Sequence, residues 1–456
     1  MNASPAGTEL DLQQLAQEVV ERATRAGATA AEAIVREGDE FSTTVRLGEV
    51  ETLKESGSRA LGLRVFIGQR VGSTYSSDFS AEGIERLVDG AIELAKITSE
   101  DPDAGLPRRE QLGKVEGDLD LYYADVYSLP ADQRIDYARR AEAAATSADP
   151  RITNSDGATF DASTGRKVLA NSLGFVGDTQ RSYCSVSAVP IAEQNGAMQR
   201  DYWYSVARTI TKLDSPEEVG RVAAARTLRR LGARKVPTQR VPIVLDPMVS
   251  RSLIDHIFEA VNGDSVYRHA SFLAGKLGES VAGTNLTVID DGTMVGGFGT
   301  SAFDGEGIPT RRTVVIENGV LKSYLLNCYT ARKLGLETTG NASRGITGNP
   351  GIGSGNLYLE PGDRSPQEII RSVKSGLYVT EFLGFGVNLV TGDFSRGASG
   401  LWIENGELTY PVEEITVAGN LKDMFRNIAA IGNDLEWRGS TACPTLLLEG
   451  MTVAGE

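Results

Sequence analysis

Two segments rich in proline, glycine and charged residues divide this chain, and they predict domain boundaries. The first is TSEDPDAGLPRREQLGKVEGD at residues 98–118, and the second is ARKVPTQRVP at residues 233–242. Such composition is typical of loops and linkers. A chain of 456 residues is also longer than one hydrophobic core usually serves. We therefore predict separate domains at residues 1–100, 119–232 and 241–456.

The first predicted domain combines amphipathic helices with strands. Apolar residues recur at helical spacing from about Leu10 to Ala26, and Ser80 is placed to cap a second helix. Residues 31–56 and 60–78 alternate apolar and polar side chains around glycine-containing turns, which indicates an antiparallel meander. We expect a sheet with helices packed on one side.

The other two domains differ in their helix and strand signals. An alanine-rich helix is expected near residues 131–147, and Ser215, followed by proline and then by glutamate three positions on, marks another helix start. The last domain is mostly strand, and Asn-Gly pairs within IENG at 316–319 and 403–406 predict tight hairpins. The predicted fold class is α+β, with an N-terminal helix and antiparallel-sheet domain, a central α/β segment and a C-terminal β-rich domain.

Charge and cysteine content limit the classes of function. The formal net charge of −15 opposes binding to a phosphate backbone, so we expect no nucleic-acid partner. Three widely spaced cysteines without a CxxC pair suit a reducing compartment. The N-terminal residues lack a secretory leader pattern, and no apolar run approaches the ~20 residues of a membrane span. We expect a soluble cytoplasmic protein without membrane contact.

Both histidines of the chain lie in one short stretch, SLIDHIFEAVNGDSVYRHA at residues 252–270. His256 and His269 are too far apart to hold one metal ion from neighbouring helical turns. His256 and Glu259 share a helix face, although such a pair is common without any metal. Cys328 and Cys443 are more consistent with core packing than with catalysis, and no GxSxG motif accompanies them.

Glycine-rich runs at residues 290–307 and 345–356 match neither a P-loop nor a dinucleotide-binding motif. Turns are the ordinary interpretation, and such loops can also line a substrate cleft. Asp304 and Glu306 lie close together in the first run, so a weakly supported calcium or magnesium site stays open there.

Long phrases along nearly the whole chain resemble one known family. They include RLGEVETLKESGSRALGLRVF, MQRDYWYSVART, SYLLNCYTARKLGLETTG and TGDFSRGASGLWIENGELTYPVEEITVAGNLKDMFRNI. The chain resembles the TldD/PmbA family, historically described as modulators of DNA gyrase, and is most similar to its PmbA/TldE branch. In this family, TldD-type subunits carry a zinc-binding HExxxH motif and pair with PmbA-type subunits that lack it.

The resemblance implies that the metal motif is absent here. Aligning the family's motif with FEAVNG places Phe258 and Gly263 at the two histidine positions and keeps Glu259. The third ligand of the active branch is a cysteine near the C-terminus, and Cys443 lies in that neighbourhood. We expect no catalytic and no metal-binding residue in this chain, with His256, Glu259 and Cys443 as the only weak candidates.

The resemblance therefore predicts a non-catalytic subunit of a heterodimeric peptidase that degrades or processes unfolded, flexible peptides. Zinc is expected in a TldD-type partner and no cofactor in this chain, which could form a homodimer when alone. Peptide capture by an added β-strand is expected at sheet edges and glycine-rich loops of the last 200 residues. Two alternatives stay open: a metallopeptidase in its own right with an atypical site, and a binding protein without proteolytic function.

Overall fold

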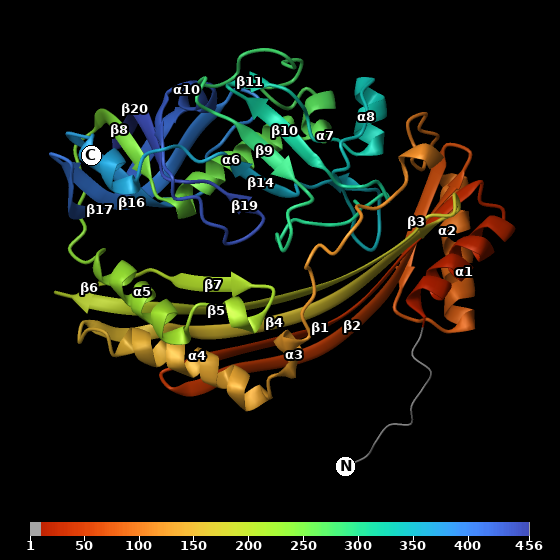
Figure 1. The fold of residues 1–456 in the computed structure, drawn as a ribbon, viewed down its shortest axis with the longest axis horizontal. Coiled ribbons are helices and arrows are strands. Elements are labelled where there is room, and N and C mark those ends of the chain that lie inside the picture. The colour runs from red at the N-terminus through yellow and green to blue at the C-terminus, as the bar shows by residue number, and fades with distance from the viewer. Residues whose placement is uncertain (1–10, 456) are drawn as a thin grey trace.

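A seven-stranded antiparallel sheet forms the N-terminal half of the computed structural model, which describes residues 11–455. The strand order is β3-β2-β1-β4-β5-β6, and β7 also pairs with β5. The strands are β1 (Ala30–Arg46), β2 (Glu49–Ile67), β3 (Arg70–Ser76), β4 (Ile152–Asn171), β5 (Val176–Gln194), β6 (Ala197–Arg200) and β7 (Trp203–Ala207). The long strands curve across the molecule and leave one concave face (Figure 1).

The strands of the first two predicted domains belong to this one sheet. β1 pairs with β4 in register from Glu32 opposite Asn171 to Val45 opposite Ala158. The segment 98–118 is a connection that contains only a short 3-10 turn at Arg109–Gln111. Alternation in sequence indicates strands but does not specify which distant strand each one joins.

Helices cover the convex face of the sheet at both ends. α1 (Leu12–Arg25) and α2 (Ala81–Ile97) pack on β1–β3, while α4 (Ala131–Thr146) and α5 (Pro216–Leu228) pack on β4 and β5, with short α3 (Asp125–Ser128) beside them. The predicted helix starts are confirmed, because Ser80 accepts the N–H of Gly83 and Ser215 accepts that of Glu218. A 3-10 turn at Ile210–Lys212 precedes α5.

The C-terminal half contains a small barrel. The sheet order is β17-β16-β15-β8-β20-β18, and β17 also pairs with β20, which closes five strands into a ring. These strands are β8 (Gln239–Leu245), β15 (Ser375–Leu383), β16 (Asp393–Glu404), β17 (Glu407–Asn420), β18 (Ile428–Ile431) and β20 (Leu446–Ala454). The helices of this half are α6 (Pro247–Val261), α7 (Gly263–Tyr267), α8 (Cys328–Leu334), α9 (Pro366–Arg371) and α10 (Leu421–Arg426).

A second sheet of this half has the order β11-β10-β9-β14-β19. It comprises β9 (Val288–Asp291), β10 (Arg312–Glu317), β11 (Val320–Leu321), β14 (Asn356–Leu359) and β19 (Thr441–Ala442), and β12 (Ala342–Ser343) pairs with β13 (Gly351–Ile352) nearby. Both predicted Asn-Gly hairpins form, with positive φ at Asn318, Gly319, Asn405 and Gly406. The α+β fold class is confirmed.

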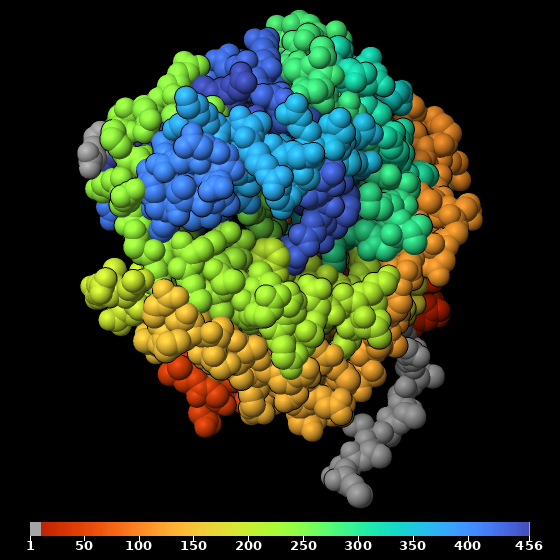
Figure 2. All heavy atoms as spheres, turned by 60° about the vertical axis from the view of Figure 1, so that its left-hand side comes forward, coloured from red at the N-terminus to blue at the C-terminus, as the bar shows by residue number. Residues whose placement is uncertain are grey.

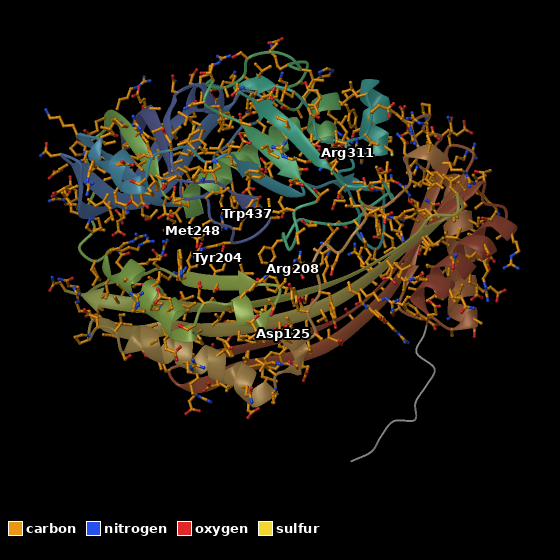
Figure 3. The ribbon with its side chains drawn as sticks, in the orientation of Figure 1. Asp125, Tyr204, Arg208, Met248, Arg311 and Trp437 are labelled. Atoms are coloured by element: carbon orange, nitrogen blue, oxygen red, sulfur yellow. The ribbon has the colours of Figure 1, made fainter. Side chains whose placement is uncertain are left out.

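The C-terminal half lies against the concave face of the large sheet (Figures 1 and 2). Tyr204 and Arg208 of the sheet half face Met248 and Trp437 of the other half (Figure 3). The Tyr204 hydroxyl donates to the Arg438 carbonyl at 3.2 Å, and Arg208 reaches backbone carbonyls of residues 296–298. The contact between the halves is therefore largely polar at these positions.

No helix within residues 11–455 is long and apolar enough to cross a membrane.

Candidate functional site

The segment onto which the family's metal motif aligns is broken between two helices. α6 ends at Val261, and Asn262 leaves the helical conformation with φ −60° and ψ 121°. The Asn262 side chain then caps α7 by accepting the N–H of Asp264 at 3.0 Å. On each side of the break, the backbone is bonded to Leu325 through the N–H of Gly263 and the carbonyl of Val261. Residues 258–263 therefore do not form one continuous helix.

Gly263, at the second histidine position, is buried where a side chain has no room. A Cβ atom there would lie 2.5 Å from Leu326 Cδ2, 2.7 Å from Thr330 Oγ1 and 2.9 Å from Thr330 Cβ. Real Cβ atoms are essentially never found so close to other heavy atoms. Any imidazole at this position would require α7 and α8 to move apart.

The other residues of the stretch are separated by their surroundings. Phe258 is partly buried against the C-terminal core, whereas the Glu259 side chain is 51% exposed. His256 Nδ1 lies 3.3 Å from Glu259 Oε2, so the predicted pair does form on one helix face. The His256 ring packs edge-on against Phe394, and its Nε2 is buried without a hydrogen-bond partner. His269 follows α7, exposed and with φ 54°.

Cys443 lies beside the first turns of α6, among Pro247, Met248 and Arg251. The Ser250 hydroxyl donates to the Cys443 carbonyl at 3.2 Å and to the Pro444 carbonyl at 2.8 Å. Complete burial raises the pKa of the Cys443 thiol to about 12, which opposes the thiolate that zinc would need.

No set of three His, Cys, Asp or Glu side chains within residues 11–455 is grouped so that it could hold a metal ion. The structure thus does not bring His256, Glu259 and Cys443 together as one ligand set. The residues present do not fit a zinc ion of the HExxxH type, which needs converging imidazoles.

Asp304 and Glu306 are committed to backbone contacts. The Asp304 carboxylate accepts N–H groups of Glu306, Ile308 and Ala342, and Glu306 accepts that of Cys328 at 2.8 Å. Burial and the neighbouring Glu306 raise the pKa of Asp304 to about 7, and burial raises the pKa of Glu306 as well. These carboxylates join residues 304–308 to Ala342 and Cys328, and no third His, Cys, Asp or Glu side chain within residues 11–455 joins them to form a metal-binding group.

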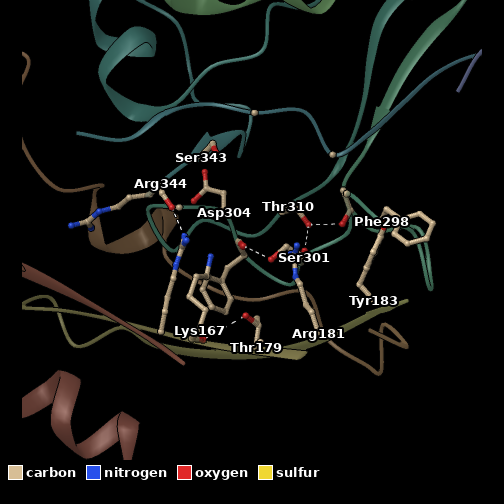
Figure 4. Close-up of a pocket in the computed structure, with 18 of the residues that line it drawn as sticks. Lys167, Thr179, Arg181, Tyr183, Phe298, Ser301, Asp304, Thr310, Ser343 and Arg344 are labelled. Atoms are coloured by element: carbon tan, nitrogen blue, oxygen red, sulfur yellow. Dashed lines mark hydrogen bonds between the residues drawn. The ribbon is translucent and has the colours of Figure 1, made fainter. Parts of the chain in front are cut away.

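The sequence did not reveal a cavity of about 660 Å³ between the concave face and the glycine-rich loops. We call it the sheet pocket. Its floor is built from β1, β4 and β5, and its roof from residues 290–311 and 340–355 (Figure 4). The residues that line it carry an excess of positive charge: Arg36, Arg166, Lys167, Arg181, Arg208, Arg311 and Arg344 against Glu37, Glu40, Asp290 and Asp304.

Strand register explains why these cations meet. Arg36 of β1 lies opposite Lys167 of β4, and Arg181 of β5 lies two pairs further along, opposite Gly165. Residues two apart on a strand share a face. Gly165 in turn pairs with Gly38, and both glycines line the pocket beside Lys167. The only sequence signal was alternation within separate strands, which does not show that the strands are neighbours.

Buried charged residues in and behind the pocket wall form ion pairs or have shifted pKa values. Arg344 pairs with Glu32 at 2.6 Å, and Glu32 also binds Arg64 at 2.5 Å, all three being buried. Burial lowers the pKa of Arg344 to about 10 and raises that of Asp290 to about 6.

Comparison with protein families gives matches over most of the chain. Residues 31–95 match the PmbA/TldA metallopeptidase domain 1, residues 124–231 its central domain and residues 238–455 its C-terminal domain. Metalloprotease PmbA of Escherichia coli O157:H7 is 41% identical over 93% of this chain and 92% of its own length. A PmbA homologue from Haemophilus influenzae is 37% identical over 98% and 97%.

Solved structures share the fold. A candidate modulator of DNA gyrase from Bacteroides thetaiotaomicron superposes with a TM-score of 0.91 at 31% identity, covering 97% of this chain and 99% of that chain. TldE from Thermococcus kodakarensis superposes with a TM-score of 0.86 at 21% identity over 97% and 100%, which supports a common fold alone.

Proposed function

The chain belongs to the PmbA/TldD metallopeptidase family, and from that premise we propose that it is the non-catalytic, PmbA/TldE-type subunit of a two-subunit peptidase. In this proposal, a TldD-type partner supplies the zinc ion and the cleavage reaction. This chain supplies part of the chamber in which an unfolded, flexible peptide is held.

The observation that carries the proposal is the packing at Gly263. The position where the motif needs its second imidazole is filled by Thr330 and Leu326 of the segment entering α8. Cys443 adds a buried thiol whose pKa is about 12, and it lies beside a different part of α6. Recovering a zinc site would therefore require repacking α7 against α8, and a side-chain rotation would not suffice.

Two surface features support assembly with another chain. Residues 49–60 of β2 are bonded to β1 on one side, while β3 pairs with β2 only from Leu61 onward. Within the part of the chain that the structure describes, this leaves a strand edge that another chain could extend. Phe385, in the loop after β15, is fully exposed, and Leu383 at the end of β15 and Val390 of that loop are also exposed.

The test is to combine this chain with a TldD-type partner and to measure cleavage of an unstructured peptide by each chain alone and by both together. We expect cleavage only with the partner present, and faster cleavage with both. A matched pair of variants shows which of the two chains carries out the cleavage. Glu259→Gln in this chain should leave the rate unchanged, whereas Glu→Gln in the partner's HExxxH should abolish cleavage.

The first alternative, a metallopeptidase in its own right, is favoured by the name metalloprotease that the bacterial relatives carry. Metal analysis of the purified chain decides between the two proposals. Stoichiometric zinc that survives dialysis, and that is lost in Cys443→Ala, would overturn the non-catalytic assignment. A binding protein without proteolytic function would be indicated if no HExxxH-bearing chain co-purifies from the native host.

A further inference from the structure

Lys167 is a half-buried cation that lines the sheet pocket. Within residues 11–455 its amine makes no hydrogen bond and no ion pair, and its one close contact of this kind is the Phe303 ring at 5.3 Å. In Figure 4 its side chain rises from the sheet into the cavity beside Arg181. An ammonium group that is partly withdrawn from water is normally compensated by a counter-ion or by hydrogen-bond acceptors, so an unpaired one that faces a cavity indicates a place for an anionic ligand.

The neighbouring cations increase this unbalanced charge. Arg36 lies directly opposite Lys167 on the next strand and donates to the carbonyl of Arg344, while its Nε is buried without a partner. Arg181 donates to the Thr300 carbonyl at 2.7 Å and forms no ion pair with a described residue. Burial and these two guanidinium groups lower the pKa of Lys167 to about 8.

None of the acids that line the pocket forms an ion pair with Lys167 among the described residues. Asp304 is the acid that acts on Lys167, but its two oxygens already accept three backbone N–H groups. By contrast, Arg166 of the lining has a carboxylate partner in Asp178 at 2.8 Å. Arg208 also differs from Lys167, because it is bound by backbone carbonyls on both sides of the pocket.

The pocket has the size and shape for an elongated ligand. Its volume of about 660 Å³ lies within the range of ligand sites in proteins. The paired glycines Gly38 and Gly165 keep the floor low next to Lys167, so an extended main chain can approach the sheet there.

We propose that the sheet pocket binds a carboxylate of an extended peptide, and that Lys167 and Arg181 hold this carboxylate. The carboxylate can be the peptide's C-terminus or an Asp or Glu side chain, since both present the same two oxygens to the cations. The inference rests on the proposed function only in identifying the ligand as a peptide. A ligand with that charge removes the electrostatic cost of the unpaired cations.

Fluorescence anisotropy with the full-length chain tests this. Three labelled peptides of one flexible sequence are compared: one with an internal Glu and a free C-terminus, one amidated at the C-terminus, and one with that Glu replaced by Gln. Loss of affinity in the amidated peptide assigns the C-terminus, and loss in the Gln peptide assigns the side chain. We expect about a tenfold loss in one of them, the size of a charge-assisted contact.

Lys167→Met should weaken binding of the acidic peptide about tenfold and abolish discrimination between the peptides. Lys96→Met is the matched control, because it removes the same charge from an exposed position on α2 and should change nothing. Equal affinity for all three peptides, or equal binding by wild type and Lys167→Met, would refute the carboxylate site.

A second measurement needs no variant. Acetic anhydride labels free amines, and mass spectrometry reports how far the Lys167 amine is acetylated at each peptide concentration. The acidic peptide should protect Lys167 from acetylation, while an exposed lysine away from the pocket, such as Lys96 on α2, stays reactive. Protection by inorganic phosphate alone, without protection by the peptide, would also overturn the proposal.

The outcomes separate this inference from the proposed function. If the two subunits together cleave the peptide but acidic and neutral peptides bind equally, the carboxylate site is refuted and the subunit role stands. If binding depends on Lys167 but no cleavage occurs when the partner is present, the carboxylate site stands and the subunit role is refuted.

Discussion

The α6–α7 junction and the sheet pocket differ in how tightly they are packed and in whether their charges are paired. At the junction, Gly263 lies where even one added carbon would overlap Leu326 and Thr330, and no described set of ligands converges. In the sheet pocket, Gly165 lines a cavity and a Cβ there would meet only the Glu37 carbonyl at 3.9 Å, while Lys167 has no counter-ion among the described residues. Similarity in sequence directs attention to the first region, whereas the unsatisfied chemistry lies in the second. Sequence similarity and unpaired charge thus point to two different regions of this molecule.

The largest expected effect concerns the ion cluster that supports the pocket wall. Glu32→Gln leaves Arg64 and Arg344 buried without their shared carboxylate, so the free energy of unfolding should fall by about 3–5 kcal/mol. Urea denaturation measures the change. Glu51→Gln, which breaks the exposed pair with Arg46, is the control and should have little effect. A similar small effect of both variants would mean that the wall does not depend on this charge balance.

The next effect tests the packing at the junction. Gly263→Ala should lower the free energy of unfolding by about 1–3 kcal/mol, because the new methyl group has no space. Gly90→Ala within α2 is the matched control, since its Cβ would meet only Thr74 Cγ2 at 4.0 Å. That control should stabilise the protein by roughly 0.5–1 kcal/mol. If both glycines tolerate alanine equally, the junction is more open than the contacts imply.

The smallest effect is the pH dependence of Asp290 in the pocket wall. Burial raises its pKa to about 6, so the folded state holds the proton more tightly than the unfolded chain. Its contribution to stability is therefore present at acidic pH and is lost as pH rises from about 4 through about 6. Asp290→Asn should reduce the fall in unfolding free energy between pH 5 and 7.5 by about 1 kcal/mol.

Chemical denaturation of wild type and Asp290→Asn at both pH values gives this difference directly. The same fall in both proteins would assign the pH dependence to other groups, of which Asp304 with its raised pKa of about 7 is the first to examine.

Local signals in the sequence predicted local structure well. The helix starts at Ser80 and Ser215 and the two Asn-Gly hairpins form as predicted, because each depends on residues a few positions apart. The candidate site was predicted less completely. The i, i+3 pairing of His256 with Glu259 could be read from helical spacing, but the orphaned Nε2 of His256 could not.

The pocket could not be predicted, because its cations come from strands that are remote in sequence. Arg36 and Lys167 become neighbours only through the pairing of β1 with β4, which the sequence does not specify. Each is one of 46 Lys and Arg residues, and nothing in the chain marks it as unpaired.

By itself the sequence determined the family, the α+β class, and the absence of imidazoles at Phe258 and Gly263, because these depend on residue identity and short-range conformational preference. The tertiary structure alone decided that Gly263 has no room for a side chain. It also decided that Lys167 faces a cavity and has no counter-ion among the described residues. Space and charge balance around a side chain are set by segments that are distant in the sequence, such as Leu326 and Thr330 for Gly263 and Phe303 for Lys167, and the free energy of those contacts exists only once the chain has folded.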